Sequence, residues 1–306
     1  MSVIGFDTSN YTTSIAVYSP QNSKNYSKLL PVKQGELGLR QSDAVFHHTK
    51  GLPELSDRLF SDLSNEIFTA VGVSTRPRAV EGSYMPCFMV GYSHAKLLAD
   101  ALHVPLIECS HQQGHIASAL YSAERLDLMD SPHLAWHLSG GTTELLYVEP
   151  EGRNVKCTKI GGTTDISAGQ LIDRTGQLLQ LPFPSGKHLD VLSTDAAGTD
   201  LFRIKCSGAE FSLSGMENKV GQYHLSSGNT CETAAYTLRS LADVILRATV
   251  NAQSEYHLPV VFSGGVASNS LLRKVLSPID PIFAQPCYST DNAMGVAIIA
   301  SRMQED

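Results

Sequence analysis

Two short runs of β-forming side chains stand close to the N-terminus. Residues 3–7 and 14–18 are rich in β-branched, aromatic and other apolar residues, and a small, polar segment at residues 8–13 separates them. Runs of this kind favour β-strands, and small polar residues between them favour a turn. The pattern therefore predicts a strand, a turn and a second strand at the start of the chain.

The same pattern recurs later in the chain. Residues 134–138 and 144–148 form two further β-rich runs around the turn SGGTT. The two turns align as S-x-x-T-T, one starting at Ser9 and the other at Ser139. An internal duplication changes the expected fold, and this spacing is far too long for a solenoid. The chain is therefore expected to contain two similar lobes.

The remaining apolar pattern predicts helices that alternate with short buried strands. Helices are expected at residues 52–63, 90–102, 166–181, 232–252 and 291–303, and strands at residues 70–74, 105–109 and 260–262. Such alternation predicts a mixed α/β sheet in each lobe. The polar stretch at residues 122–131 marks the expected boundary, so one lobe covers residues 1–125 and the other covers residues 126–306.

Composition excludes several classes of protein. The 306 residues include 23 Lys and Arg against 30 Asp and Glu, for a net charge of −7, and 42% are hydrophobic. This balance excludes a disordered chain and argues against broad binding of phosphate backbones. No apolar run is long enough to cross a membrane, and the N-terminus lacks the basic segment of a signal peptide. Six cysteines without a CxxC pair predict a reduced, intracellular chain, and we expect it in the cytoplasm.

Three turns of small or polar residues, two of which contain glycine, are the first candidates for a binding site. Ser139-Gly140-Gly141 follows one predicted strand, Ser263-Gly264-Gly265 follows another, and the turn after Ser9 is related to the first. Glycine lets the main chain approach a phosphate, and the exposed N–H groups and hydroxyls bind it. The alternative is that these are ordinary hairpin turns. Neither a P-loop nor a GxGxxG motif is present.

His111 and His115 form the motif HQQGH. On a helix this spacing places both imidazoles on one face, as a metal pair requires, whereas the alternatives are helix-surface or capping roles. Gln112 stands where the HExxH metalloproteases have their glutamate base, which argues against protease chemistry. A third ligand must come from elsewhere. Asp291 is one candidate, with an N-cap as its alternative role, and His137 is another, with an ordinary strand position as its alternative.

Three further polar residues have candidate roles. Asp7 ends the first strand, where a carboxylate orients water or a metal beside phosphates, or caps the turn. Asp173 lies in an amphipathic helix, where it is either a solvated residue or an acceptor for ribose hydroxyls. Asn269 follows the turn Ser263-Gly264-Gly265, and its amide suits contact with a base edge or a ribose.

Together these motifs resemble the tRNA threonylcarbamoyladenosine transferases, long called glycoprotease-like proteins. Seven segments run in the family's order across almost the whole chain: GFDTSNYTTSIAVY, HQQGH, HLSGGTTELL, GQLIDRTGQLLQLPFPSG, FSLSG, FSGGVASNSLLR and STDNAMGVA. The resemblance implies a duplicated two-lobe actin-like ATPase fold, the ASKHA class of sugar kinases, actin and Hsp70, with a central cleft. It also allows the last helix to pack back on the first lobe.

The resemblance also implies an activity. Members move a threonylcarbamoyl group from its AMP anhydride, an acyl-adenylate, to the exocyclic nitrogen of an anticodon-loop adenosine in tRNA. They use one divalent metal ion, iron or zinc, and bind an adenine nucleotide such as ATP or AMP. The implied partners are the adenylate substrate, tRNA and accessory proteins of the threonylcarbamoyl pathway.

Position by position, the resemblance assigns residues to these tasks. The implied metal ligands are His111, His115 and Asp291, with His137 as an additional candidate. The implied substrate and nucleotide contacts are His137, Leu138, Ser139, Gly140, Gly141, Asp173, Gly186 and Asn269. In such a site the metal acts as a Lewis acid and the turns hold AMP as the leaving group. For catalysis itself only Asp7 is a candidate.

The chain departs from the family at four places. Tyr11 and Thr12 replace an acidic pair, Thr142 replaces a histidine or asparagine, Glu217 replaces a lysine, and TRPRAVEGSYMP, at residues 75–86, replaces a shorter glycine-rich segment. These differences identify a divergent member. They leave two alternatives to tRNA modification, namely transfer from a carbamoyl-adenylate to a different acceptor, and a non-catalytic nucleotide-binding partner subunit.

Overall fold

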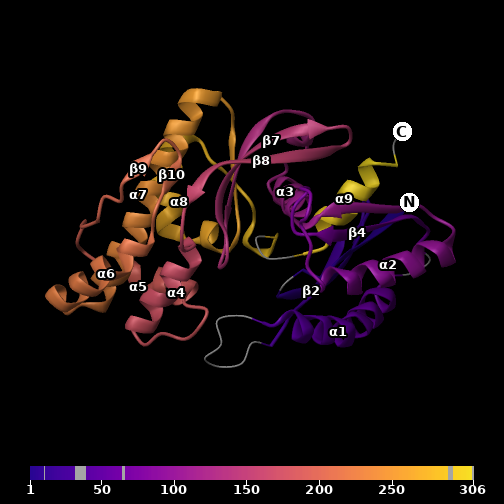
Figure 1. Cartoon of the computed structure of the whole chain (residues 1–306), viewed down its shortest axis with the longest axis horizontal. Helices are drawn as coiled ribbons and strands as arrows, with labels where there is room; N and C mark the ends of the chain where they lie inside the picture. The colour runs from indigo at the N-terminus through magenta and orange to yellow at the C-terminus, as the bar shows by residue number, and fades with distance from the viewer. Residues whose placement is uncertain (10, 32–38, 64–65, 289–291, 305–306) are drawn as a thin grey trace. The chain divides into compact units, whose positions relative to one another are not determined.

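Both predicted hairpins are present in the computed structural model, and each belongs to a separate sheet (Figure 1). The structure describes residues 1–9, 11–31, 39–63, 66–288 and 292–304. The chain forms two units. Unit 1 comprises Met1–Ser131, Glu149–Cys157 and Asp291–Asp306, and unit 2 comprises Pro132–Val148 and Thr158–Thr290. The boundary expected after residue 125 lies close to the end of the first stretch of unit 1.

The sheet of unit 1 has the strand order β3-β2-β1-β4-β5. Its strands are β1 (Ser2–Asp7), β2 (Thr12–Tyr18), β3 (Lys24–Leu29), β4 (Phe68–Arg76) and β5 (Leu106–Ser110). Strands β1, β2 and β3 are antiparallel neighbours, whereas β1, β4 and β5 run parallel. The carboxyl ends of β1, β4 and β5 therefore lie along one edge of the sheet, where α/β proteins commonly bind ligands.

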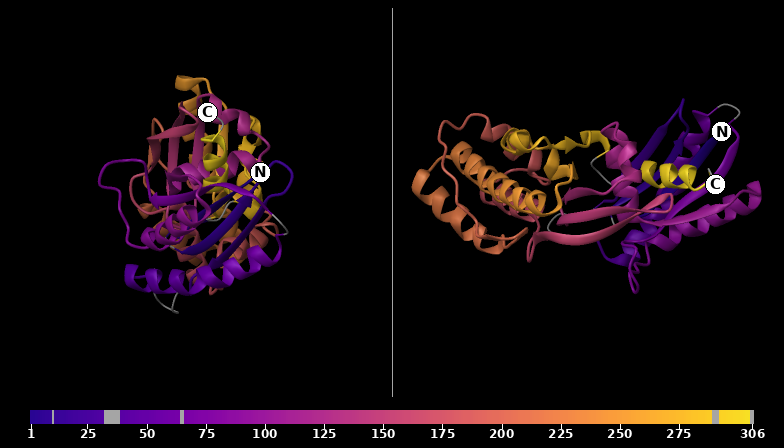
Figure 2. Two further views of the ribbon diagram at one scale, coloured as in Figure 1. Left: turned by 90° about the vertical axis from the view of Figure 1, so that its right-hand side faces the viewer. Right: turned by 90° about the horizontal axis from the view of Figure 1, so that it is seen from above.

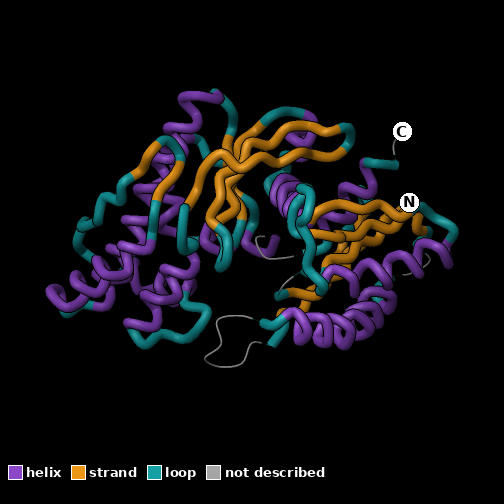
Figure 3. Tube along the Cα trace, in the orientation of Figure 1, coloured by secondary structure: helices purple, strands orange, loops and turns teal. Residues whose placement is uncertain are grey.

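Helices cover both faces of this sheet (Figure 3). They are α1 (Gln41–Ser61), α2 (Phe88–Leu102), α3 (His111–Ser122) and α9 (Met294–Arg302). The 3-10 helix η1 (Leu126–Asp130) packs on α3. Ile4 and Val71 face a core shared with α1 and α2, and Val3 packs on the other face beside Ala300 of α9. A Cβ on Gly5 would lie 2.8 Å from the Ala293 carbonyl oxygen, so the glycine is what allows the α9 segment to lie against β1.

Unit 2 contains the second sheet, with the order β12-β11-β6-β7-β8-β10-β9. Its strands are β6 (His133–Leu138), β7 (Thr143–Glu151), β8 (Asn154–Thr163), β9 (Cys206–Ser207), β10 (Glu210–Phe211), β11 (Val260–Ser263) and β12 (Ile282–Phe283). Its helices are α4 (Ala168–Leu178), α5 (Gly186–Ser193), α6 (Ser214–Ser227), α7 (Thr230–Tyr256), α8 (Ser270–Leu276) and the 3-10 turns η2 (Gly265–Ser268), η3 (Ser277–Ile279) and η4 (Pro286–Tyr288). The tip of the β7–β8 hairpin is part of unit 1.

The two sheets repeat one topology. The order β8-β7-β6-β11-β12 in the second sheet matches β3-β2-β1-β4-β5 in the first. The hairpins β1–β2 and β6–β7 are both antiparallel. On the other side, β1 pairs in parallel with β4, and β6 pairs in parallel with β11. The duplication predicted from two short turns is therefore confirmed as a repeat of whole sheets.

The core of unit 2 forms around β6, β11 and α7. Trp136 and Phe262 are fully buried, and the Trp136 indole N–H donates to Thr249 Oγ1 of α7 over 2.9 Å. A buried indole needs such an acceptor, because an unpaired N–H in the core is costly. Helix α7 extends beyond the predicted residues 232–252, since Asn229 caps its start by accepting the N–H groups of Cys231 and Glu232.

Three other helices also differ from their predicted bounds. Helix α1 begins well before the expected residue 52, because Ala44 and His48 are buried and this packing extends the helix past Pro53. Helix α4 is shorter than predicted, since a capping box between Ser167 and Gln170 sets its start. The last helix begins at Met294, and Asp291, its predicted N-cap, lies outside the described residues.

Both the N-terminus and α9 belong to unit 1 (Figure 2). The last helix packs against β1, β4 and α3. None of the helices in the described part of the chain is long and apolar enough to cross a membrane.

A histidine is buried between α1 and the first hairpin. His48 is fully buried, and its Nδ1 lies 2.8 Å from Thr13 Oγ1 on β2. Its Nε2 has no hydrogen-bond partner among the described residues. Burial lowers the pKa of His48 to about 4, although the Asp7 carboxylate acts in the opposite direction. The imidazole is therefore neutral in the folded protein near neutral pH.

Replacing His48 by Gln should remove a part of the acid sensitivity of folding. The folded-state pKa of about 4 lies below the unfolded value of about 6.5, so the unfolded chain binds more protons between these values. The contribution of His48 to stability is therefore complete above about pH 6.5 and declines as the pH falls toward about 4. Urea unfolding should show about 1–2 kcal/mol less acid-induced loss for His48→Gln between about pH 7 and pH 5. The exposed His257, changed to Asn, is the control, and equal acid sensitivity of wild type and His48→Gln would contradict the prediction.

Candidate functional site

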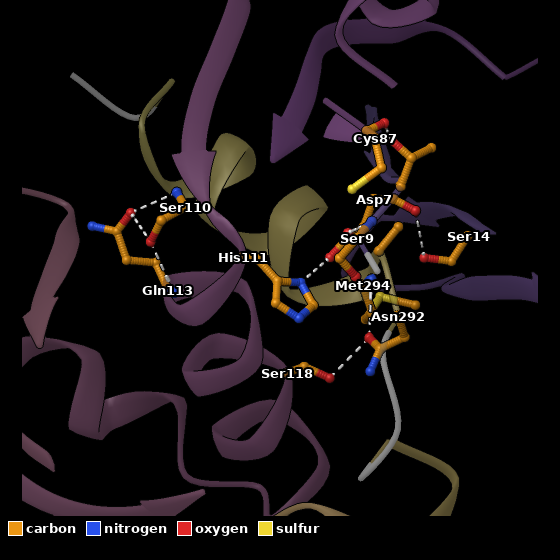
Figure 4. Close-up of polar contacts among 12 residues, drawn as sticks. Asp7, Ser9, Ser14, Cys87, Ser110, His111, Gln113, Ser118, Asn292 and Met294 are labelled. Carbon is orange, nitrogen blue, oxygen red and sulfur yellow. Dashed lines mark hydrogen bonds and ion pairs between the residues drawn. The ribbon is translucent and has the colours of Figure 1, made fainter. Parts of the chain in front are cut away.

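The Asp7 carboxylate lies at the carboxyl end of β1 and is almost fully buried, with 2% of the side chain exposed. Its Oδ2 lies 2.7 Å from His111 Nδ1, and its Oδ1 accepts the Ser9 N–H over 2.8 Å (Figure 4). Because an ionised carboxylate only accepts hydrogen bonds, the imidazole donates from Nδ1. The Nε2 atom of His111 is then the ring nitrogen left with a lone pair, as a metal ligand needs.

The start of α3 is fixed on several sides. Ser110 and Gln113 form a capping box, in which the Ser110 hydroxyl accepts the Gln113 N–H and the Gln113 side chain accepts the Ser110 N–H. The Gln112 N–H donates to the Pro77 carbonyl over 3.0 Å. His111 is therefore the first residue of a well-anchored helix.

His111 and His115 lie on one face of α3, with ring centroids 4.2 Å apart. The HQQGH motif is helical, as the prediction of a shared histidine face requires. Two imidazoles, one of them held by a carboxylate behind it, suit a divalent metal such as zinc or iron. Among the described residues no group of three His, Cys, Asp or Glu side chains is arranged as a metal site. Asp291, the expected third ligand, lies outside the described residues.

The segment just before α9 is tied to α3. The Ser118 hydroxyl, one turn beyond His115, donates to Asn292 Oδ1 over 2.9 Å, and the same oxygen accepts the Met294 N–H (Figure 4). A Cβ on Gly295 would lie 1.8 Å from the Gly114 carbonyl oxygen, so α9 packs directly on α3 at Gly114. The sequence neighbour of Asp291 is therefore held beside the histidine pair.

The predicted nucleotide-binding residues all lie in unit 2. The turn at residues 139–142 closes through the Ser139 N–H and the Thr142 carbonyl, 2.8 Å apart. The hydroxyl of Ser167, the N-cap of α4, donates to the Gly140 carbonyl over 2.6 Å. A Cβ on Gly169 would lie 2.4 Å from Gly140 Cα. The turn therefore rests on the N-terminus of α4, a favourable place for an anion.

The turn Ser263-Gly264-Gly265 contacts the end of β6, the strand that leads into the turn at residues 139–142. Gly264 has φ +95°, and a Cβ there would lie 2.2 Å from the Leu138 carbonyl oxygen. A side chain is excluded by both the backbone conformation and the space. Leu138 is fully buried, whereas His137 is half-buried on β6, opposite Glu144 of β7 and Ser263 of β11.

Asp173 is not a simple solvated residue. It is half-buried on α4, and its Oδ1 accepts the Ser185 N–H over 2.8 Å, directly before Gly186. Burial raises the pKa of the Asp173 carboxyl, and the hydrogen bond from Ser185 opposes that shift. The carboxylate thus fixes the loop that leads into α5.

Asp190 is a further candidate residue that the sequence pattern did not indicate. Its carboxylate accepts Asn269 Nδ2 over 2.9 Å and both the N–H and the hydroxyl of Ser270. The other end of the Asn269 amide caps α8 by accepting the Leu272 N–H. The available signal was an aspartate one turn into the helix that begins at Gly186. We call the turn at residues 139–142, Ser167 and the two hydrogen-bonded pairs Asp173–Ser185 and Asp190–Asn269 the unit 2 network.

At positions 142 and 217, the residues that depart from the family make ordinary polar contacts. Glu217 of α6 forms an ion pair with Arg174 of α4, with Oε2 and Nη1 2.6 Å apart and both side chains about half exposed. Such a pair stabilises by less than about 1 kcal/mol. The Thr142 N–H donates to Ser139 Oγ. Thr12 is buried on β2, and Tyr11 is half-buried.

The chain was compared with known proteins. Residues 32–298 match the family model described as TsaD, tRNA N6-adenosine threonylcarbamoyltransferase. A protein of that name from Geobacillus thermodenitrificans is 32% identical over 321 residues, covering 96% of this chain and 89% of the relative. Another from Lactococcus lactis subsp. cremoris is 30% identical over 298 residues, covering 90% of this chain and 82% of the relative.

Solved structures support the fold. HypF of T. kodakarensis aligns with a TM-score of 0.60 at 14% identity, over 99% of this chain and 47% of HypF. A ROK hexokinase from Thermus thermophilus aligns with a TM-score of 0.56 at 12% identity over the whole of both chains. The two repeated sheets thus have the predicted duplicated actin-like fold. By sequence, the chain belongs to the TsaD family, the tRNA N6-adenosine threonylcarbamoyltransferases.

Proposed function

We propose that this protein transfers a threonylcarbamoyl group from threonylcarbamoyl-AMP to the exocyclic N6 of an anticodon-loop adenosine in tRNA. The observation that carries the proposal is the Asp7–His111 contact beside His115 in a chain of this family. A buried carboxylate costs free energy unless a partner compensates for it. His111 offsets the cost of burying Asp7, and a carboxylate that orients a histidine for a metal favours an enzyme over a non-catalytic partner subunit.

His111 and His115 would hold one divalent metal ion, iron or zinc, with Asp291 as the third ligand. The support for Asp291 is the bond from Ser118 to Asn292, which holds the residue that follows Asp291 in sequence against α3. His137 belongs to unit 2 and remains a candidate for an additional ligand. When bound, the metal supplies a Lewis acid for a phosphate or carbamoyl oxygen.

The unit 2 network would bind the adenylate. The N–H groups of Gly140 and Gly141 and the N-terminus of α4 suit the phosphate. Asp173 uses Oδ1 for Ser185, and its Oδ2 has no hydrogen-bond partner within the described residues, so it can accept a ribose hydroxyl. In the transfer, N6 forms a bond to the carbamoyl carbon and loses a proton, while the bond from that carbon to the phosphate oxygen breaks and AMP leaves.

The proposal is tested in cells that lack their own family member but keep the accessory proteins. Expression of the wild-type chain should restore threonylcarbamoyl-adenosine in tRNA, measured by mass spectrometry of nucleosides. The double variant His111→Ala/His115→Ala should reduce the product to background, because both proposed ligands are removed. His257→Asn, an exposed change in unit 2, should keep wild-type levels.

Absence of the modified nucleoside in tRNA from cells that contain folded wild-type protein would overturn the proposal. Transfer to a different acceptor would then be indicated by consumption of the adenylate without modified tRNA. A non-catalytic partner subunit would be indicated by no consumption at all.

Asp7→Asn should weaken binding of Zn²⁺ by about 10- to 100-fold, because a neutral amide holds and polarises the His111 ring less well than a carboxylate does. Competition with a chromogenic chelator measures the affinity without any activity assay. Asp57→Asn, an exposed carboxylate of α1, is the matched control. Equal affinities of Asp7→Asn and wild type would show that Asp7 does not position a metal ligand.

Gly169→Ala should weaken binding of ATP and AMP by about 10-fold or more, since its Cβ would displace Gly140 and overpacking of this kind costs about 1–3 kcal/mol. Calorimetric titration of metal-loaded protein measures the affinities. Gly221→Ala on α6 is the matched helical control, because nothing lies within 4 Å of the added Cβ. Wild-type nucleotide affinity in Gly169→Ala would exclude the turn from the binding site.

A further inference from the structure

The loop after β4 contains a cavity of about 380 Å³. Its lining residues are Arg76, Ala79, Val80, Glu81, Gly82 and Ser83. The loop is shaped by two backbone contacts, in which the Arg78 N–H donates to Ser83 Oγ over 3.0 Å and the Pro77 carbonyl accepts the Gln112 N–H of α3. The cavity therefore belongs to a loop that is anchored to the helix carrying His111.

Arg76 is placed at the ligand-binding edge of the first sheet. It is the last residue of β4 and pairs with Ser110, the last residue of β5, directly before His111. The pairing of β4 with β5 shifts register between Ser74 and Arg76, and an irregularity of this kind re-aims the side chain that follows it. Asp7, Arg76 and Ser110 thus end three parallel strands along one edge.

The Asp7 carboxylate at this edge pairs with His111. Arg76 is an unneutralised cation, since its guanidinium forms no hydrogen bond or ion pair within the described part of the chain and its side chain is exposed.

We propose that Arg76 binds a phosphate group of a substrate beside the Asp7–His111 pair. The planar guanidinium matches the paired oxygens of a phosphate, and the N-terminus of α3 adds positive potential at the same edge. Glu81, in the same cavity, opposes the anion and sets the strength of binding. The inference rests on the proposed function, which supplies phosphate from two sources, the adenine nucleotide and the RNA backbone.

The test measures two ligands against the same variants of the full chain. ATP is titrated calorimetrically, and a tRNA transcript is titrated by filter binding at several salt concentrations. Arg76→Ala should lower the affinity for the ligand whose phosphate Arg76 contacts by about 10-fold or more. Arg76→Lys should recover only part of the affinity because it keeps the charge but not the paired geometry. Glu81→Gln should strengthen binding of the same ligand.

The two sources give different results. If the phosphate belongs to RNA, Arg76→Ala lowers the salt dependence of tRNA binding by about 0.7 in log–log slope and leaves ATP unchanged. If it belongs to the nucleotide, ATP affinity falls and the slope for tRNA stays the same. Lys50→Ala, which removes an exposed charge from α1, should change neither.

Three results would overturn the inference: unchanged binding of both ligands by Arg76→Ala, equal losses in Arg76→Ala and Lys50→Ala, or no binding of either ligand by wild type. Nucleoside analysis of tRNA distinguishes this failure from that of the proposed function. If tRNA carries modified adenosine but Arg76→Ala binds both ligands as wild type does, only the proposed anion site at Arg76 is rejected. If binding depends on Arg76 but tRNA carries no modified adenosine, only the transferase proposal is rejected.

Discussion

The contact between Asp7 and His111 joins two parts of the chain that are far apart in sequence, and much of unit 1 is arranged around it. The carboxylate is buried at the end of β1, where it needs compensation by a hydrogen-bond donor. That donor arrives because β1, β4 and β5 are parallel, so the strand that leads into α3 ends beside Asp7. The capping box at Ser110 then fixes where the helix begins. A small error in strand register would leave the carboxylate without its partner.

Much of the fold follows from local sequence pattern. The hairpins, the strands at β4 and β11, and the helix α2 are set by runs of apolar residues whose period matches their burial. The duplication was visible because both hairpins carry small residues in their turns, and turn chemistry is a local property. The start of α1 was not visible, because its first turns are held by burial of Ala44 and His48 against elements that follow a separate pattern. Tertiary packing, rather than propensity, sets that boundary.

The candidate site was predictable to a different degree in each unit. Two histidines four residues apart predict a shared helix face without knowledge of the fold, and that face is present. Asp190 and Arg76 have no such local pattern. Asp190 contacts Asn269 across 79 positions of the chain, and Arg76 reaches its place through strand pairing with Ser110. Contacts of this kind depend on topology, which a single sequence does not display.

Each unit holds its own set of candidate residues through internal contacts. Asp7, the capping box of α3 and the bond from Ser118 to Asn292 keep the histidine pair in place within unit 1. Within unit 2, the bonds from Ser167 to Gly140, from Ser185 to Asp173 and from Asn269 to Asp190 connect the glycine turn to α4, α5 and α8. Because each set is held by contacts within its own unit, a substitution in one set acts first on the geometry of that unit.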